Sequence, residues 1–319
     1  MLHHMAHASL SIVIPVYNSA MILPKLVEQL HGLLPALAAD HEIILVNDGS
    51  QDESWSVISK LSATYPELRG FNMMRNYGQH NALLCGIRAA RYDVIVTMDD
   101  DLQHPPEEIP KLLAKLAEGF DVVYGTPEEL PHSWWRNLFS NLIKLLLASV
   151  MGVGTFRNIS AFRALRVGLR QAFAGYNSPD VIIDVLFSWG TTRFGSVTVR
   201  HDPRLGSAST YSLRKLFNTA ILVLTGFSTT PLRVASITGF TFMFFGLLVF
   251  VYVLFVYFLV GSLPGFPFLA SIISLFSGAQ LFTLGLFGEY LARIFTRSME
   301  RPPYIVSETT GDEGNGFQP

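Results

Sequence analysis

A stretch of 55 residues without an acidic, basic or histidine side chain, residues 234–288, most limits what this 319-residue chain can fold into. A helix needs about 20 apolar residues to cross a bilayer, so the stretch can hold two spanning helices. We place them at residues 234–260 and 266–288, with a tight turn between them. Buried helices of a soluble core are rarely this long or this free of charge. The sequence therefore predicts a two-helix transmembrane hairpin.

Basic residues on both flanks predict the orientation of the hairpin, because cytoplasmic segments next to a span are enriched in lysine and arginine. They are Arg214, Lys215 and Arg233 before the hairpin, and Arg293, Arg297 and Arg301 after it. The turn between the helices carries no charge. We therefore expect a multi-pass protein of the cytoplasmic (inner) membrane, with both long ends of the chain facing the cytoplasm.

Charge and cysteine content narrow the classes of partner and compartment. A formal net charge of −2 disfavours a nucleic-acid partner. Cys85 is the only cysteine, which excludes an internal disulfide and fits a reducing compartment. Residues 1–9 lack the basic and apolar regions of a signal peptide, so we expect them to be a leader outside the folded domains.

Residues 10–125 alternate between short apolar runs and amphipathic stretches, which is the pattern of a parallel sheet with crossover helices. The runs predict strands at residues 10–16, 41–46, 68–74, 92–98 and 121–124. Further on, residues 181–189 predict a buried helix and residues 192–199 predict another strand. The fold class is therefore α/β, with a mostly parallel sheet and helices on both of its faces.

The composition divides the chain into five segments. Residues 1–9 are the leader and residues 10–210 the α/β domain. Residues 211–233 contain Asn218, Ser228 and Pro231, which favours juxtamembrane helices lying in the membrane interface over a third span. Residues 234–290 hold the two transmembrane helices. Residues 291–319 are a cytoplasmic tail, which we expect to be disordered after Val306.

Polar clusters follow four of the predicted strands at the point where each strand ends. They are Tyr17-Asn18, Asn47-Asp48, residues 75–80 and residues 99–103. Ligands of open α/β sheets bind at the carboxyl edge, so we expect these loops to converge on one crevice. No GxGxxG follows the first strand and no GxxxxGK[ST] occurs anywhere, which excludes the dinucleotide fingerprint and the P-loop.

The acidic cluster Asp99-Asp100-Asp101, followed by Gln103, has two interpretations. Three neighbouring carboxylates repel one another, and their hard oxygen atoms suit Mg²⁺ or Mn²⁺, which a diphosphate could share. Alternatively, the cluster is an exposed acidic turn in which Asp101 or Gln103 caps a helix that starts near Pro105. The cluster alone does not decide between them.

A series of motifs resembles those of family 2 glycosyltransferases of the GT-A fold. The motifs are SIVIPVYN at 11–18, VNDGS at 46–50, RNYGQHNA at 75–82, DDDLQHPPEEIP at 99–110, TTPLR at 229–233, GEYLARI at 288–294 and RPPY at 301–304. With the two spans, they resemble the polyprenyl-phosphate branch, which includes dolichyl-phosphate mannose synthases, undecaprenyl-phosphate glucosyltransferases and the aminoarabinose transferase of lipid A modification. The resemblance covers residues 9–306 and implies a GT-A (Rossmann-like) catalytic domain on the cytoplasmic side.

The resemblance also implies roles for individual residues. The nucleotide-binding residues would be Pro15, Tyr17, Asn18, Asp48, Arg75, Gln79, Asp99 and Asp100. The catalytic residues would be Asp99, Asp101 and Arg163, and the ligands of a metal cofactor, Mg²⁺ or Mn²⁺, would be Asp101 and Gln103. The acceptor-phosphate residues would be Arg136, Arg157, Arg204 and Ser209. An arginine near a membrane can also simply extend its charge to lipid headgroups.

The activity that the resemblance implies is an inverting sugar transfer. The donor would be a nucleotide sugar, UDP-linked rather than GDP-linked, and the acceptor undecaprenyl or another polyprenyl phosphate. The product would serve cell-envelope glycan modification. Relatives assemble through their membrane helices, so we also expect a homo-oligomer such as a tetramer.

Three positions depart from the family pattern. Pro127 stands where relatives carry arginine, and Arg157 stands where they carry an acidic residue. Thr210 replaces the lysine of a G-x-S-K-Y loop, which is one residue longer here. The departures motivate an alternative, a catalytically impaired member that binds or scaffolds the lipid carrier. A processive polysaccharide synthase is disfavoured, because the chain lacks a Q-x-x-R-W segment and further spans.

Overall fold

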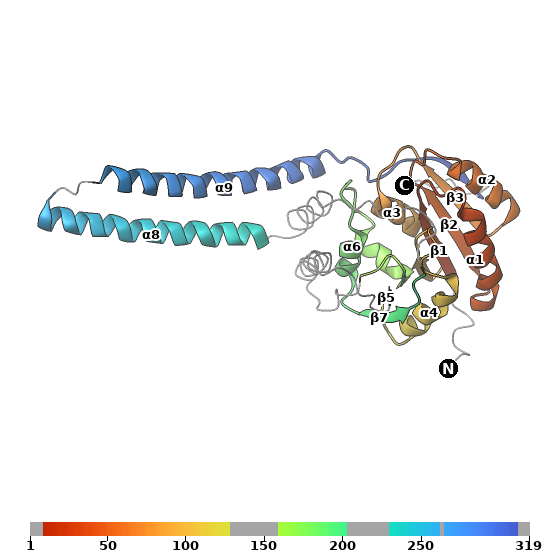
Figure 1. Cartoon of the computed structure of the whole chain (residues 1–319). Coiled ribbons are helices and arrows are strands. Elements are labelled where there is room, and N and C mark those ends of the chain that lie inside the picture. The colour runs from red at the N-terminus through yellow and green to blue at the C-terminus, as the bar shows by residue number, and fades with distance from the viewer. Residues whose placement is uncertain (1–8, 128–158, 203–229, 262–264, 312–319) are drawn as a thin grey trace. The chain divides into compact units, whose positions relative to one another are not determined.

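The computed structural model describes residues 9–127, 159–202, 230–261 and 265–311 (Figure 1). These residues belong to two compact units. The first contains the described residues up to 202 together with 300–311, and the second contains the described residues from 230 to 299. Residues 1–8, 128–158, 203–229, 262–264 and 312–319 lie outside the described part of the chain, so the predicted leader and interfacial helices stay predictions.

Within the described residues, the first unit is built on an eight-stranded sheet in the order β7-β5-β6-β4-β1-β2-β3-β8. The strands are β1 (Leu10–Val16), β2 (His41–Asn47), β3 (Leu68–Met73), β4 (Val94–Thr97), β5 (Val122–Pro127), β6 (Arg163–Arg166), β7 (Phe194–Val199) and β8 (Val306–Thr310). Strands β1 to β5 and β7 run in one direction, and β6 and β8 run against them. The predicted mostly parallel α/β sheet is confirmed.

Helices cover both faces of this sheet, and Figure 1 shows α1 and α3 on opposite sides of it. The helices are α1 (Leu23–Leu37), α2 (Ser54–Thr64), α3 (Gln79–Ala89), α4 (Ile109–Ala117) and α6 (Ile183–Gly190), with 3₁₀ segments η2 (Pro106–Glu108) and η4 (Val167–Phe173). Helices α1, α2 and α4 pack on the face that carries Ile12, Ile43 and Val123. Because both faces are covered, all seven residues of β1 are buried, and its sequence reads as a continuous apolar run.

Strand β6 was not predicted, because arginines stand at both of its ends. Its two central residues, Ala164 and Leu165, are fully buried between β4 and β5. Both pairings of β6 are antiparallel, which makes it the one reversed strand inside an otherwise parallel arrangement.

Strand β8 corrects the prediction of a disordered tail after Val306. Val306–Thr310 pairs antiparallel with β3, with Thr310 opposite Gly70 and Glu308 opposite Asn72. The segment is polar because its residues lie exposed or half-buried at the edge of the sheet, whereas its backbone bonds to β3. Polarity predicted disorder here, but the β-branched residues of the segment suit an edge strand.

The second unit consists of helix α8 (Thr230–Val260) and helix α9 (Phe266–Ser298), which cover the two predicted spans. Phe242 of α8 and Phe276 of α9 meet edge to face, with ring centroids 5.6 Å apart. Among the described residues, one helical stretch, Pro231–Leu259, is long and apolar enough to cross a membrane, with a mean hydropathy of 2.6 and none of it buried. The second span and the orientation stay predictions.

Two helical glycines predict opposite effects of an added methyl group. A Cβ on Gly86 of α3 would overlap a methyl of Val13 in β1 and lie 3.2 Å from Val46 Cγ2. Valine is stiff at χ1, so we expect Gly86→Ala to destabilise the protein by about 1–3 kcal/mol. No described atom lies within 4 Å of a Cβ on Gly32 of α1, and Gly32→Ala should stabilise it by up to about 1 kcal/mol. Chemical denaturation of the full-length protein measures both, and equal signs would contradict this account of helix packing.

Candidate active site

Hydrogen bonds tie together the loops that follow β1, β2 and β4 at the carboxyl edge of the sheet. Asn18 lies in the left-handed region, with φ 54°. Its side-chain Oδ1 accepts the backbone amide of Gln51 at 2.8 Å, and its backbone amide donates to Ser50 Oγ at 3.0 Å. The Tyr17 amide donates to Asp100 Oδ2 at 3.3 Å. The expected convergence of these loops is therefore present in the structure.

Asp48 holds the loop after β3 against the loop after β2. Its two carboxylate oxygens accept the amides of Tyr77 at 2.7 Å and Gly78 at 2.9 Å. Burial raises the pKa of Asp48, and the two amide bonds act in the opposite direction because they favour the charged carboxylate. Asp48 thus has a clear positioning role in the loop, and its contact with a nucleobase stays a prediction.

The loop after β3 also reaches the acidic cluster. Gln79, at the start of α3, donates from Nε2 to Asp99 Oδ1 at 2.7 Å. The Arg75 guanidinium lies over the ring of Tyr77, 4.4 Å from its centroid, and the Arg75 side chain is exposed. Tyr17, in the loop after β1, is 47% exposed. An exposed aromatic ring and an exposed guanidinium are groups that can contact a base and a phosphate.

The acidic cluster is not an exposed capping turn. Asp101 is only 7% exposed and accepts the Gln103 amide at 3.1 Å, across Leu102 in the left-handed region with φ 57°. The next helical segment starts from Pro105, without a side-chain cap. Burial raises the pKa of Asp100, and bonds from Ser19 and Tyr17 oppose that shift. The second interpretation of the cluster is therefore wrong.

The ligand chemistry at the cluster fits a hard divalent cation that is only partly held by protein. Asp101 and Gln103 offer carboxylate and amide oxygens, which are the ligands that Mg²⁺ and Mn²⁺ prefer. In the part of the chain that the structure describes, no group of three or more His, Cys, Asp or Glu side chains is placed to hold a metal ion. A cation bound here would take its remaining ligands from water and substrate phosphates, as Mg²⁺ usually does.

Two histidines beside the cluster were missed in the sequence. His104 stacks on Phe162, with ring centroids 5.2 Å apart, and its Nε2 lies 3.4 Å from Nδ1 of His201. Burial lowers the pKa of His104 to about 4, and His201 adds to this effect, so the imidazole is neutral at pH 7. The Asp202 amide donates to the Gln103 carbonyl at 2.8 Å, which brings the segment after β7 to the acidic loop.

Arg163 lies within a buried polar network. It is 2% exposed, its Nε donates to Thr97 Oγ1 at 2.9 Å, and its guanidinium forms an ion pair with Asp184 of α6. The Tyr124 hydroxyl donates to Asp184 at 2.9 Å. Thr97 is the last residue of β4 and lies two residues before Asp99, so the network supports the acidic cluster. The predicted catalytic role of Arg163 stays a prediction, because its charge is already paired inside the protein.

The other predicted residues divide into two groups. Pro15 is buried inside β1, so its side chain belongs to the core below the loops. The predicted acceptor-phosphate residues lie outside the described residues; they are Arg136, Arg157, Arg204 and Ser209. Of the departures, Thr210 is also outside, whereas Pro127 ends β5 opposite Val199.

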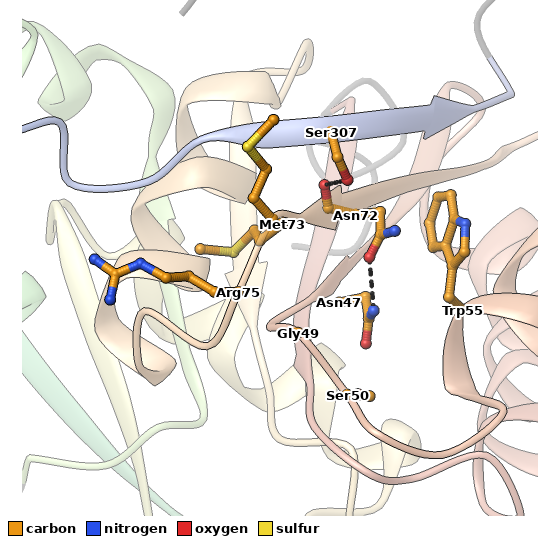
Figure 2. Close-up of a pocket in the computed structure, with 9 residues that line it drawn as sticks. Asn47, Gly49, Ser50, Trp55, Asn72, Met73, Arg75 and Ser307 are labelled. Carbon is orange, nitrogen blue, oxygen red and sulfur yellow. Dashed lines mark hydrogen bonds between the residues drawn. The ribbon is translucent and has the colours of Figure 1, made fainter.

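A cavity of about 360 Å³ lies beside the loops, on the α2 side (Figure 2). Asn47, Trp55, Asn72 and Ser307 are among its lining residues, and Arg75 is the only predicted site residue that lines it. The Asn47 carboxamide donates to Asn72 Oδ1 at 2.7 Å in its wall. Asp99, Asp100 and Asp101 do not line this cavity, so it is separate from the acidic cluster.

Comparison with solved structures identifies the fold. The chain is similar to glucosyl-3-phosphoglycerate synthase from Mycobacterium tuberculosis in complex with phosphoglyceric acid, at 18% identity and a TM-score of 0.51 over 68% of this chain and 78% of that one. It is similarly related to the same enzyme in complex with Mn²⁺, UDP and glucosyl-3-phosphoglycerate, at 19% identity and a TM-score of 0.50, with the same coverage. The fold is therefore the GT-A glycosyltransferase fold.

Sequence comparison gives the family. Residues 11–171 match the model described as Glycosyl transferase family 2, and the chain belongs to this family. It is 36% identical to the undecaprenyl-phosphate 4-deoxy-4-formamido-L-arabinose transferase of Enterobacter sp. (strain 638), over 93% of this chain and 92% of that protein. It is 34% identical to the transferase of the same name from Serratia proteamaculans (strain 568), over 96% and 95%. The protein is a glycosyltransferase.

The buried Arg163–Asp184 pair predicts a large loss of stability when one partner is removed. Arg163→Met leaves the Asp184 carboxylate buried without its counter-ion, and we expect a loss of about 3–5 kcal/mol in the free energy of unfolding. Arg163→Met combined with Asp184→Leu should recover much of this loss, because no uncompensated charge remains. Chemical denaturation measures the three variants.

The matched control is Arg193→Met at the Arg193–Asp121 pair, whose arginine side chain is 66% exposed and whose aspartate keeps Arg166 and Thr191 as partners. Solvent screens such a pair, so the change should be small. A loss for Arg163→Met no larger than for Arg193→Met would contradict the structural role of Arg163. Turnover per folded molecule then shows whether Arg163 contributes to catalysis as well.

Proposed function

We propose that the protein transfers a sugar from a nucleotide sugar to the phosphate of undecaprenyl or another polyprenyl phosphate, for cell-envelope glycan modification. The observation that carries the proposal is the end-to-end similarity to transferases named for this acceptor, at 36% identity over 93% of this chain. The match includes the apolar helices as well as the sheet domain. The impaired-member alternative is not favoured, because these relatives are named as active transferases.

The proposed donor is a UDP-linked sugar. A structural neighbour with the same fold is known in complex with UDP and Mn²⁺. The loops that we propose for the nucleotide are organised here by Asp48 and Asp100. The names of the relatives make a UDP-linked 4-deoxy-4-formamido-L-arabinose the first donor to test. Tyr17, Asn18 and Arg75 are the proposed contacts to base, ribose and diphosphate.

Asp101 and Gln103 would hold a divalent cation, Mg²⁺ or Mn²⁺, together with diphosphate oxygens of the donor. When bound, the ion would neutralise the charge that develops on the leaving nucleoside diphosphate. Asp99 is held by Gln79 at the edge of the cluster, where we propose that it orients the ribose or the sugar.

The acceptor is itself the nucleophile. A phosphate monoester has a second pKa of about 6, so its oxygen is already anionic at neutral pH and needs no strong general base. That oxygen forms the new bond to the anomeric carbon while the bond to the diphosphate breaks and the nucleoside diphosphate leaves with the electron pair. Attack opposite the leaving group inverts the anomeric centre. Arg136, Arg157, Arg204 and Ser209 are the proposed contacts to the acceptor phosphate.

The apolar helices give the reaction its location. Many large apolar side chains of α8 are exposed, among them Phe240, Phe250 and Phe258, and in water they would form a large unpartnered apolar surface. We propose that α8 and α9 both span the cytoplasmic membrane, that the sheet domain faces the cytoplasm and that copies of the chain assemble through these helices. A polyprenyl tail stays in the lipid, so its phosphate reaches the enzyme by diffusion within the membrane.

Loss of Asp101 tests the metal and transfer assignments together. Membranes with the wild type, a labelled UDP-sugar, Mn²⁺ and undecaprenyl phosphate should give label that extracts into organic solvent. We expect Asp101→Ala to abolish this product while the protein still inserts, because one of the two protein ligands of the cation is gone. Asp93→Ala is the matched control, since Asp93 is an exposed carboxylate at the opposite end of β4.

Undiminished transfer by Asp101→Ala would refute the metal assignment. A wild type that binds donor and lipid phosphate but forms no product would instead favour the impaired-member alternative.

Ligand-induced stabilisation tests the choice of nucleotide. A ligand that binds only the folded protein stabilises it by RT ln(1 + [L]/Kd), which is about 2.7 kcal/mol at a concentration of 100 Kd. We expect UDP with Mn²⁺ to raise the Tm of the sheet domain in the full-length protein, and GDP at the same concentration to raise it less. An equal or larger shift with GDP would contradict the proposed donor.

A further inference from the structure

The segment that follows α9 in sequence belongs to the first unit, which contains the sheet and the candidate active site. We define residues 301–310 as the C-terminal strap. Side-chain hydrogen bonds and a strand ladder attach it to β3 and α2. The Gly70 amide donates to Thr310 Oγ1 at 3.1 Å, and Ser307 Oγ donates to the Asn72 carbonyl at 3.0 Å. Trp55 Nε1 donates to Glu308 at 2.7 Å. The remaining contacts are the β3–β8 ladder and a bond to the residue after β3.

A second anchor of the C-terminal strap lies on α3. Tyr304 is 3% exposed, and the Arg88 guanidinium of α3 lies 5.9 Å from the centroid of its ring. Arg88 in turn donates to three backbone carbonyls at the end of η4 and just after it, including that of Tyr176 at 2.7 Å. A tyrosine ring that is buried in this way fixes the strap against the helix that begins with Gln79.

The two anchors lie on either side of one loop. We define residues 74–78, between β3 and α3, as the donor loop. The Met74 amide donates to the Ile305 carbonyl of the strap at 3.0 Å, directly before Arg75. The donor loop ends at Gly78, where Tyr77 and Gly78 donate to Asp48 and where Gln79 then reaches Asp99. The strap therefore holds the strand that enters the donor loop and the helix that leaves it.

Packing alone does not hold the donor loop on its α2 side. There the cavity of about 360 Å³ separates Arg75 from Trp55, and Ser307 of the strap forms part of its wall (Figure 2). The loop makes one close contact at Gly49, which also lines the cavity and where a Cβ would overlap the backbone of Arg75 and Asn76. The position of the loop therefore depends on backbone hydrogen bonds, and the strap provides the one at its start.

We propose that the C-terminal strap is a positioning element of the donor site: docked on β3 and under Arg88, it sets the donor loop in the conformation that binds the nucleotide. Tyr304 is its key positioning residue and touches no substrate. This inference rests on the proposed function, because it assumes a nucleotide donor at these loops. By linkage, nucleotide binding and strap docking stabilise each other to the same extent.

Substitution of Tyr304 tests the inference in the full-length protein in nanodiscs. Tyr304→Ala should weaken UDP–Mn²⁺ binding about tenfold, which corresponds to the loss of one or two net hydrogen bonds in the loop. The KM for the donor should rise while the KM for polyprenyl phosphate stays unchanged. Tyr304→Phe keeps the ring and should restore binding. Ile305→Ala is the matched control within the strap, because its side chain is 41% exposed and its carbonyl is retained.

Hydrogen exchange provides a second measurement, and its first comparison uses the wild type alone, so it does not depend on how well the variant folds. In the wild type, saturating UDP–Mn²⁺ should slow amide exchange in residues 305–310, none of which is a proposed nucleotide contact. In Tyr304→Ala without nucleotide, the amides of Tyr77 and Gly78 should exchange faster than in the wild type.

The outcomes separate this inference from the proposed function. A wild type that binds UDP–Mn²⁺ without any change of exchange in the strap overturns the inference and leaves the donor assignment standing. Equal UDP affinity of folded Tyr304→Ala and the wild type does the same. A wild type that binds neither UDP nor GDP overturns the donor assignment and the inference with it.

Discussion

Bonds from backbone amides to buried carboxylates organise the candidate site, and the other features of the site depend on them. Parallel strands bring their loops to one edge, but this alone does not fix the loops relative to one another. Asp48 accepts two amides from the loop after β3, and Asp100 accepts one from the loop after β1. Burial raises the pKa of both carboxyl groups, and the bonds compensate for part of that cost. Because the protein itself orders these loops, less conformational entropy is lost when a ligand binds.

A second buried network supports the acidic cluster from below. Arg163 joins β6 to Thr97 of β4 and to Asp184 of α6, so three elements meet at one guanidinium. A buried ion pair adds little net stability, since both charges lose their hydration. It does favour one arrangement of the surrounding side chains when all of its hydrogen bonds are satisfied. Here the geometry matters, because Thr97 leads directly into Asp99. The acidic cluster is thus carried on a strand end that is fixed on its α3 side by charge and on its α1 side by apolar packing.

The parts of this fold that could be predicted are those with a local signal. The continuous apolar run of β1 and the polar residues after each strand predicted the sheet and the convergence of its loops. β6 could not be found this way, because its two buried apolar residues, Ala164 and Leu165, lie between arginines and are buried only by tertiary packing. The partners of Arg163 and Tyr304 also have no local signal, since they are set by tertiary packing. β8 is the extreme case: Thr310 bonds to Gly70 across a separation of 240 residues, and its polar side chains predicted disorder.

The late return of the chain to the sheet has a physical reason. Without β8, β3 would be an edge strand with unpaired amides and carbonyls next to the donor loop, and such edges pair readily with other chains. The pairing segment follows α9, so the first unit holds the chain both before and after the apolar helices. An enzyme with the proposed acceptor would thus have the sheet beside its donor site completed by the segment that follows its apolar helices.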